Sequence, residues 1–196
     1  MTKQERAIRT REALRQTAAE IFAREGFVHA SLPLISHAAG VSKGALYFHF
    51  HSKDHLARVI EEEADARLKR ILEHAQGREG ATSLQNVVDA TYALMEGIAS
   101  DAVVRAGFRL GAESARVSSV DLWGRWRGWV RSMLVQAESS GELAPGVSRV
   151  AVGAVIVIAM AGFEALASKN AEWSAPERLN WLWELLLPRL EARSCP

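Results

Sequence analysis

A segment near the N-terminus, residues 31–53, carries side chains whose types and spacing suit contact with nucleic acid. Lys43 supplies positive charge for a phosphate, and Gly44 lets the backbone approach closely. Tyr47 offers a ring and a hydroxyl that can reach a phosphate or a thymine methyl group, and His49 is a further candidate for a base contact. These residues predict a surface that reads double-stranded DNA.

The histidines of this segment also allow a different chemistry. His51 and His55 would lie one turn apart on a helix, a spacing at which two imidazoles can hold one metal ion, and His49 and Asp54 are close in sequence. However, the spacing matches no strong metalloenzyme signature such as H-E-x-x-H, and the chain has no nucleophile elbow, phosphate loop or cysteine–histidine pair. A metal-dependent enzyme is therefore the less favoured alternative, and we expect no catalytic residue, metal or cofactor.

Local sequence predicts that two short helices position this surface. Ser31 can cap the first helix, and Gly40 is free to adopt the positive φ that ends a helix and reverses the chain. Ser42 can cap the second helix, whose Leu46 and Phe50 would point inward. The outward face of the second helix then carries Lys43, Gly44 and Tyr47, as the DNA-contacting helix of a helix-turn-helix does.

The charge distribution agrees with a DNA-facing N-terminal end. Residues 1–60 contain nine Lys or Arg and five Asp or Glu, a formal charge of +4, while the remaining fifteen and eighteen give −3 for residues 61–196. A basic helix predicted from about Glu5 to Glu25 carries Arg6, Arg9, Arg11 and Arg15 in its first half. The predicted DNA contacts are Arg6, Arg9, Ser31, Ser42, Lys43, Gly44, Tyr47, His49 and Lys53.

Three motifs in this region resemble the TetR family of bacterial repressors. They read G-F-x-x-A-S at 26–31, A-G-V-S-K-G-A-L-Y-F-H-F at 39–50 and S-K-D-H-L at 52–56. The resemblance implies that three helices bind DNA, that a long fourth helix is a connector, and that the remaining helices bind a small molecule and dimerise.

A narrower resemblance points to the γ-butyrolactone receptor branch of that family. It rests on the words Y-F-H-F at 47–50 and V-V-R-A-G-F-R-L at 103–110, and on a tryptophan at Trp126. The branch uses the matching tryptophan to wall its pocket, which makes Trp126 the leading ligand-contact residue. Ser36 departs from the small apolar residue that the family usually has there. The other predicted pocket residues are Trp123, Met95, Phe108, Leu110 and Phe163.

Composition and periodicity predict an all-α protein, with an N-terminal three-helix helix-turn-helix domain and a larger helical domain for ligand binding and dimerisation. We expect the first domain at 1–51 and the second at 52–196. The connector helix should run from Ser52 to about Gln76, where a Gly-Arg-Glu-Gly run ends it. Further helices are predicted at 82–99, 101–114, 118–139, 148–168 and 175–192.

Two C-terminal helices are too apolar to face solvent. Residues 150–163 contain only apolar residues and glycine, and these fourteen are too few to span a bilayer core of about 30 Å at about 1.5 Å per residue. We therefore expect a buried helix and a two-fold dimer that reads a pseudo-palindromic operator. The predicted dimer contacts are Val150, Ala154, Val155, Ile158, Gly162, Trp181, Leu182 and Leu185.

The sequence predicts the identity of the effector less precisely than it predicts DNA binding. A small amphipathic, γ-butyrolactone-like signal follows from the resemblance, and a repressor of the same fold that answers to an antibiotic, to a pathway intermediate or to no ligand is the alternative. The polar N-terminus lacks a secretory signal, and the single cysteine, Cys195, is expected to be a tail residue, so a cytoplasmic location is predicted.

Overall fold

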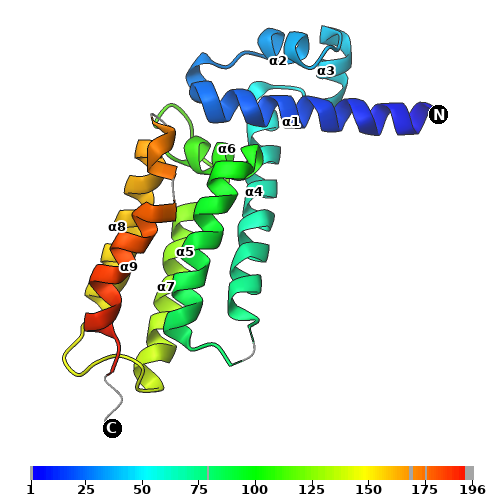
Figure 1. The fold of residues 1–196 in the computed structure, drawn as a ribbon. Helices are drawn as coiled ribbons and strands as arrows, with labels where there is room; N and C mark the ends of the chain where they lie inside the picture. Colours follow the sequence, from blue (N-terminus) through cyan, green and yellow to red (C-terminus); the bar gives the residue numbers. More distant parts are fainter. Residues whose placement is uncertain (1, 79, 168–169, 175, 193–196) are drawn as a thin grey trace. The chain divides into compact units, whose positions relative to one another are not determined.

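The computed structural model describes residues 2–78, 80–167, 170–174 and 176–192. Over these residues the chain forms nine α-helices and one short 3-10 helix, and its only β pairing is an isolated bridge between Leu143 and Glu191. The predicted all-α class is confirmed, while Cys195 lies outside the described residues. Figure 1 labels the elements as α1 Lys3–His29, α2 Leu32–Ala38, α3 Lys43–His49, α4 Lys53–Gln76, α5 Ser83–Ser100, α6 Ala102–Gly111, α7 Leu122–Ser139, α8 Arg149–Ala167, η1 Ala171–Ser174 and α9 Pro176–Leu190.

The helices form two compact units. The first contains residues 1–67 and 100–122, and therefore α1, α2, α3, most of α4 and all of α6. The second contains residues 68–99 and 123–196, with the end of α4 and nearly all of α5 and α7, together with α8 and α9. The sequence predicts a single domain boundary after residue 51. The compact units differ from this prediction, because α6 belongs to the N-terminal unit.

Close packing explains why α6 belongs to the first unit. Gly107 of α6 lies against α4, because a Cβ placed on it would come within 2.3 Å of the Ala64 Cβ. Phe108 and Leu110 are fully buried. Burial of two large apolar side chains contributes roughly 1.5–3 kcal/mol each, which makes α6 an integral part of this unit's core.

The helix ends in the first unit follow from specific side chains. Thr2 and Glu5 form a capping box that starts α1. Gly26, with φ of 77°, interrupts the helical backbone near the end of α1, since this conformation is unfavourable for residues with a Cβ. Ser31 then caps α2 through its hydroxyl, which accepts a hydrogen bond from the Leu34 amide at 3.3 Å.

The second unit has a core with few polar groups. Trp183 of α9 donates its Nε1 proton to Thr91 Oγ1 of α5 at 2.9 Å, and both residues are buried. The Glu142 carboxylate accepts hydrogen bonds from the amides of Ser83 and Leu84, so that it caps α5 from the loop after α7. These contacts join the helices that Figure 1 shows side by side in this unit.

The apolar helix α8 differs from the expectation of a buried helix. It has 19 residues, so that by length and composition alone it could cross a membrane, a property shared by helices of soluble proteins. Only 11% of its apolar 18-residue window is buried within the chain. Val152, Ile156 and Met160 face the core, and the opposite side is open.

Candidate nucleic-acid interface and effector site

The turn between α2 and α3 has the geometry that the sequence predicts. Gly40 adopts φ of 65°, and its amide donates to the His37 carbonyl oxygen at 3.0 Å. The Val41 amide donates to the Ser36 carbonyl oxygen, also at 3.0 Å, which closes the turn. Ser42 Oγ accepts from the Ala45 amide at 3.2 Å and caps α3, so its predicted capping role is confirmed.

Helix α3 presents an aromatic and basic outer face. Leu46 and Phe50 are buried, which directs Lys43, Tyr47 and Phe48 away from the core. Tyr47 is 52% exposed and Phe48 is 76% exposed. Exposed rings beside a cation suit a DNA major groove, where they can contact thymine methyl groups and phosphates.

Phe48 is a candidate contact that the sequence analysis missed. Its position could have been derived, because Leu46 and Phe50 point inward from the same helix and leave residues 47 and 48 on the outside. His49 is only partly exposed, and its ring lies edge-on to Phe48 with centroids 5.0 Å apart. His49 therefore supports the exposed Phe48 ring. It can also contact DNA from the edge of the outer face of α3.

The arginines of α1 divide into outward and inward groups. Arg6 and Arg9 are exposed, as a phosphate contact requires. Arg15 is instead buried, where it pairs with Glu63 of α4, and the Arg11 guanidinium lies 5.6 Å from the centroid of the Phe50 ring. Of the four arginines that make this helix basic in sequence, Arg15 is therefore buried within the unit, and Arg11 is exposed but contacts its Phe50 ring.

Lys53 has a structural role that its predicted phosphate contact did not include. Its Nζ donates to the carbonyl oxygens of Phe27 and Ala30 at 2.8 and 2.9 Å, and lies 4.2 Å from the centroid of the Phe27 ring. These carbonyls end α1, so the ammonium satisfies acceptors at the negative end of a helix. The expectation for Lys53 changes accordingly from DNA contact to support of the domain.

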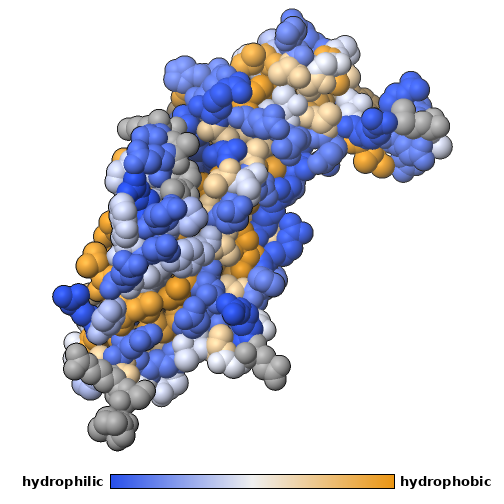
Figure 2. Space-filling view, viewed as in Figure 1, coloured by the Kyte–Doolittle hydropathy of each residue, from blue (hydrophilic) through white to orange (hydrophobic). Residues whose placement is uncertain are grey.

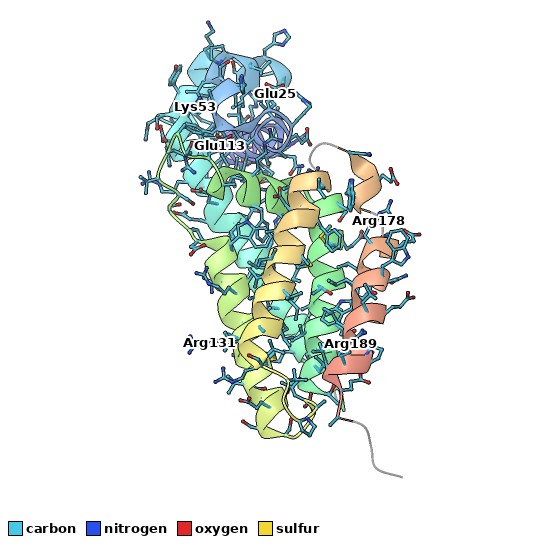
Figure 3. All side chains as sticks on the ribbon, turned by 90° about the vertical axis from the view of Figure 1, so that its left-hand side faces the viewer. Glu25, Lys53, Glu113, Arg131, Arg178 and Arg189 are labelled. Atoms are coloured by element: carbon cyan, nitrogen blue, oxygen red, sulfur yellow. The ribbon has the colours of Figure 1, made fainter. Side chains whose placement is uncertain are left out.

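The end of α1 is also held from the region of α6. The Phe27 amide donates to Glu113 Oε1 at 3.0 Å, and Arg109 Nη1 donates to the Ala23 carbonyl oxygen at 3.1 Å. A Cβ at Gly26 would come within 2.4 Å of Glu113 Oε1, so the Glu113 carboxylate would have to shift, and φ of 77° itself favours glycine. Figure 3 labels Lys53 and Glu113, which both bind this end of α1.

A buried carboxylate fixes the loop between α6 and α7. Glu61 of α4 is fully buried and accepts hydrogen bonds from the Arg116 guanidinium and from the hydroxyls of Ser118 and Ser119. Burial by itself raises the pKa of Glu61, but these hydrogen bonds outweigh it and hold the pKa below its usual value. They also explain why α7 begins at Leu122 and not at 118 as predicted.

The histidines do not assemble as a metal site. The rings of His51 and His55 stack with centroids 5.5 Å apart, and the His51 amide approaches His55 Nδ1 at 3.4 Å. Over the described part of the chain, no three His, Cys, Asp or Glu side chains are grouped so that they could hold a metal ion. The geometry therefore gives the metal-enzyme alternative no support.

The predicted pocket residues fall into both units. Phe108 and Leu110 are buried in the first unit, whereas Trp123, Trp126, Met95 and Phe163 belong to the second. Trp126 is 0% exposed, and its Nε1 has no hydrogen-bond partner among the described residues. The Trp129 ring, three residues further along α7, stacks on Trp126 with centroids 5.9 Å apart.

The geometry of α1, α2 and α3 defines the class of this protein. Two short capped helices meet at a positive-φ glycine, and the second one exposes a cation and two aromatic rings on a basic domain, which makes it a helix-turn-helix DNA-binding regulator. Residues 14–60 match the sequence model described as "Bacterial regulatory proteins, tetR family".

Three relatives extend the similarity over nearly the whole chain. The A-factor receptor protein of Streptomyces griseus is 29% identical over 192 residues, which cover 97% of this chain and 67% of that protein. A γ-butyrolactone receptor described as ArpA-like is 29% identical with a TM-score of 0.83, over 95% of this chain and 90% of that chain. CprB from Streptomyces coelicolor, solved in complex with its operator, is 28% identical with a TM-score of 0.79, over 96% and 91%.

The chain belongs to the TetR family. Over nearly its whole length it is similar to γ-butyrolactone receptors. The resemblance seen in the N-terminal motifs is therefore confirmed.

Proposed function

We propose that this protein is a dimeric, cytoplasmic repressor that leaves its operator when a small, neutral, γ-butyrolactone-like molecule binds beside Trp126. The observation that carries the effector part is the orphaned indole N–H of Trp126, which is fully buried in the second unit. A buried donor without a partner costs roughly 1–3 kcal/mol. A ligand with a carbonyl or hydroxyl oxygen would recover that cost when it accepts this proton.

The relatives support the same ligand class. The relative from Streptomyces griseus is an A-factor receptor, and one similar solved structure is that of a γ-butyrolactone receptor. Such a ligand has an apolar part and an acceptor, which matches an indole that offers both a ring face and one donor. Met95, Trp123 and Phe163 are the candidates in the same unit for its apolar contacts, because they are buried or half-buried there.

Release requires a difference in affinity between two arrangements of the protein. A hundredfold loss of operator affinity corresponds to about 2.7 kcal/mol of differential binding, which is modest for one buried ring and one hydrogen bond. Helix α4 contributes several turns to each unit, so it is our candidate for carrying the change to the DNA-binding helices.

A competition experiment tests the effector proposal. Fluorescence anisotropy should report release of promoter DNA by one or more of a panel of butyrolactones, butenolides, furans and local pathway products. Trp126→Phe keeps an aromatic ring, although a smaller one, and removes the donor. It should bind DNA normally and need at least about tenfold more ligand, which is the value of one hydrogen bond of about 1.4 kcal/mol. Trp173→Phe serves as the matched control, and an equal response of both variants contradicts the assignment.

The exposed side of α8 and α9 supports the dimer. Ile158 is 70% exposed and Leu185 is 64% exposed, and Val150, Val155 and Trp181 are exposed as well. Figure 2 shows apolar surface gathered on the side where α8 and α9 lie. A monomer seldom leaves so many large apolar residues in water, whereas a two-fold pair would cover them.

The oligomeric state provides the direct test. Light scattering should give twice the 21.5 kDa chain mass, and Ile158→Glu should shift it to that of one chain while weakening operator binding. Gln136→Glu, an exposed change on α7, is the control. A wild-type protein that stays at one chain mass at working concentration removes the dimer from the proposal.

A further inference from the structure

The fully buried position of Trp126 raises the question of how an effector reaches it. The indole has 0% exposure, so no molecule can contact it without passing between helices or displacing a neighbour. The neighbour in ring contact with it is Trp129, whose ring stacks at 5.9 Å with an interplanar angle of 19°. Trp129 is itself only half-buried.

A groove of about 420 Å³ that Trp129 lines lies between the end of α4 and the first half of α7. Its volume falls within the range of small-molecule sites. All of its residues belong to the second unit, which also contains Trp126. The lining residues are Lys69, Leu72, Glu73, Gln76, Gly124, Arg125, Gly128, Trp129 and Ser132.

Two glycines one turn apart create the α7 wall of this groove. Gly124 and Gly128 both line it, and a Cβ added to Gly128 would meet no atom within 4 Å. Glycine in a helix interior costs about 0.8–1.0 kcal/mol relative to alanine, and packing at Gly128 does not require it. The groove therefore exists because α7 has no side chains at these positions.

The lining of the groove is polar, with a small excess of positive charge. Lys69 and Glu73 lie one turn apart on α4 with Nζ and Oε1 3.8 Å apart, Arg125 adds a second cation, and Gln76 and Ser132 are neutral. Trp129 is the aromatic residue of the lining. Polar side chains around an indole suit a neutral amphipathic ring.

From these observations we propose that the α4–α7 groove is the entrance and outer binding site of the effector, and that Trp129 is its gate. A neutral ring binds first against Trp129, and rotation of that indole then exposes Trp126 to it. The inference deepens the proposed function, because it concerns the path to the same tryptophan. It also predicts a residue, Gly128, at which the path can be closed without touching the inner site.

The test uses a neutral probe and therefore needs no knowledge of the effector. Protein labelled with 5-fluorotryptophan gives one ¹⁹F resonance for each of the six tryptophans, and Phe substitutions assign those of Trp126 and Trp183. The probe is the nitroxide TEMPOL, a small neutral ring with a hydroxyl group, which broadens nearby resonances. Trp183 is the internal control, since it is 3% exposed and does not line the groove.

We expect TEMPOL to broaden the Trp126 resonance several-fold more than that of Trp183. Gly128→Leu should remove this excess, because its side chain fills the groove, whereas Gln136→Leu, an exposed change two turns further along α7, should leave it intact. Equal broadening of both tryptophans, or an excess that survives Gly128→Leu, overturns the proposal. An unfolded Gly128→Leu protein is recognised by the spectrum as a whole, and Gly128→Val, with a smaller side chain, then replaces it.

A second measurement separates this inference from the proposed function. If lactones release wild-type protein from DNA and Gly128→Leu responds at the same rate, the entrance is refuted while the function stands. If TEMPOL reaches Trp126 through the groove but no lactone, butenolide or furan releases DNA, the ligand assignment fails while the entrance stands.

Discussion

Removing the buried pair of Glu61 and Arg116 one partner at a time should reveal how the loop after α6 is held. Glu61 is 0% exposed and the Arg116 side chain is 5% exposed, so either charge left alone would remain in a poorly solvated place. Breaking such a pair typically costs about 3–5 kcal/mol. The lower end applies to Glu61→Leu, because Asp54 Oδ1 lies 3.8 Å from Arg116 Nε and partly compensates the remaining charge.

This magnitude is measurable in a chain of 196 residues. Since about 1 kcal/mol shifts Tm by roughly 2–4 °C at this size, Glu61→Leu should lower Tm by about 6–12 °C. The double variant Glu61→Leu, Arg116→Leu should be clearly more stable than Glu61→Leu, because apolar replacement of both partners leaves no buried charge. Urea and thermal unfolding of the wild type, both single variants and the double variant, all at one protein concentration, give the double-mutant cycle. A double variant that loses the sum of the two single effects would refute the pairing argument.

Three further predictions concern the first unit. Lys43→Ala should weaken operator binding and reduce the slope of log affinity against log salt concentration by about one. Lys53→Ala should mainly lower the stability of the protein and change this slope little, because its ammonium binds backbone carbonyls. DNA-binding titrations at several salt concentrations measure both slopes. Gly26→Ala should destabilise by at least about 1–2 kcal/mol in urea unfolding, since Ala disfavours φ of 77° and its Cβ meets Glu113; an unchanged midpoint argues against this reading. Asp101, which precedes α6, accepts hydrogen bonds from the Arg67 guanidinium and the Val103 amide, and these hold its pKa below its ordinary value. The stabilisation by Asp101 and Glu61 is therefore present at neutral pH and is lost as the pH falls below 3.8 and 4.5, their ordinary pKa values, so Tm should fall there and Glu61→Gln should flatten that fall.

Most of the DNA-binding surface could be predicted because its determinants are local. Ser31, Gly40 and Ser42 specify two caps and a turn through their own backbone and the next three residues. The inward positions of Leu46 and Phe50 follow from helical spacing. The same spacing also places Phe48 on the outside, so its exposure follows from the local sequence as well.

The roles of Lys53, Arg15 and Glu61 depended instead on residues far away in the chain. Lys53 meets the end of α1, Arg15 meets Glu63, and Glu61 meets Arg116, and no rule of sequence spacing relates such partners. Charged residues in sequence look alike whether they face water or each other. The assignment of α6 to the first unit likewise depends on a close contact between Gly107 and α4.

By itself the sequence determined the helices, their caps, the DNA-reading turn and the tryptophan at position 126, because helix propensity, capping and periodicity act over a few residues. Only the tertiary structure decided that Trp126 is buried with an unused donor, that Trp129 stacks on it, and that α8 remains open along one side. Burial and hydrogen-bond satisfaction are properties of the packed chain, since they depend on which distant side chains exclude water from a group.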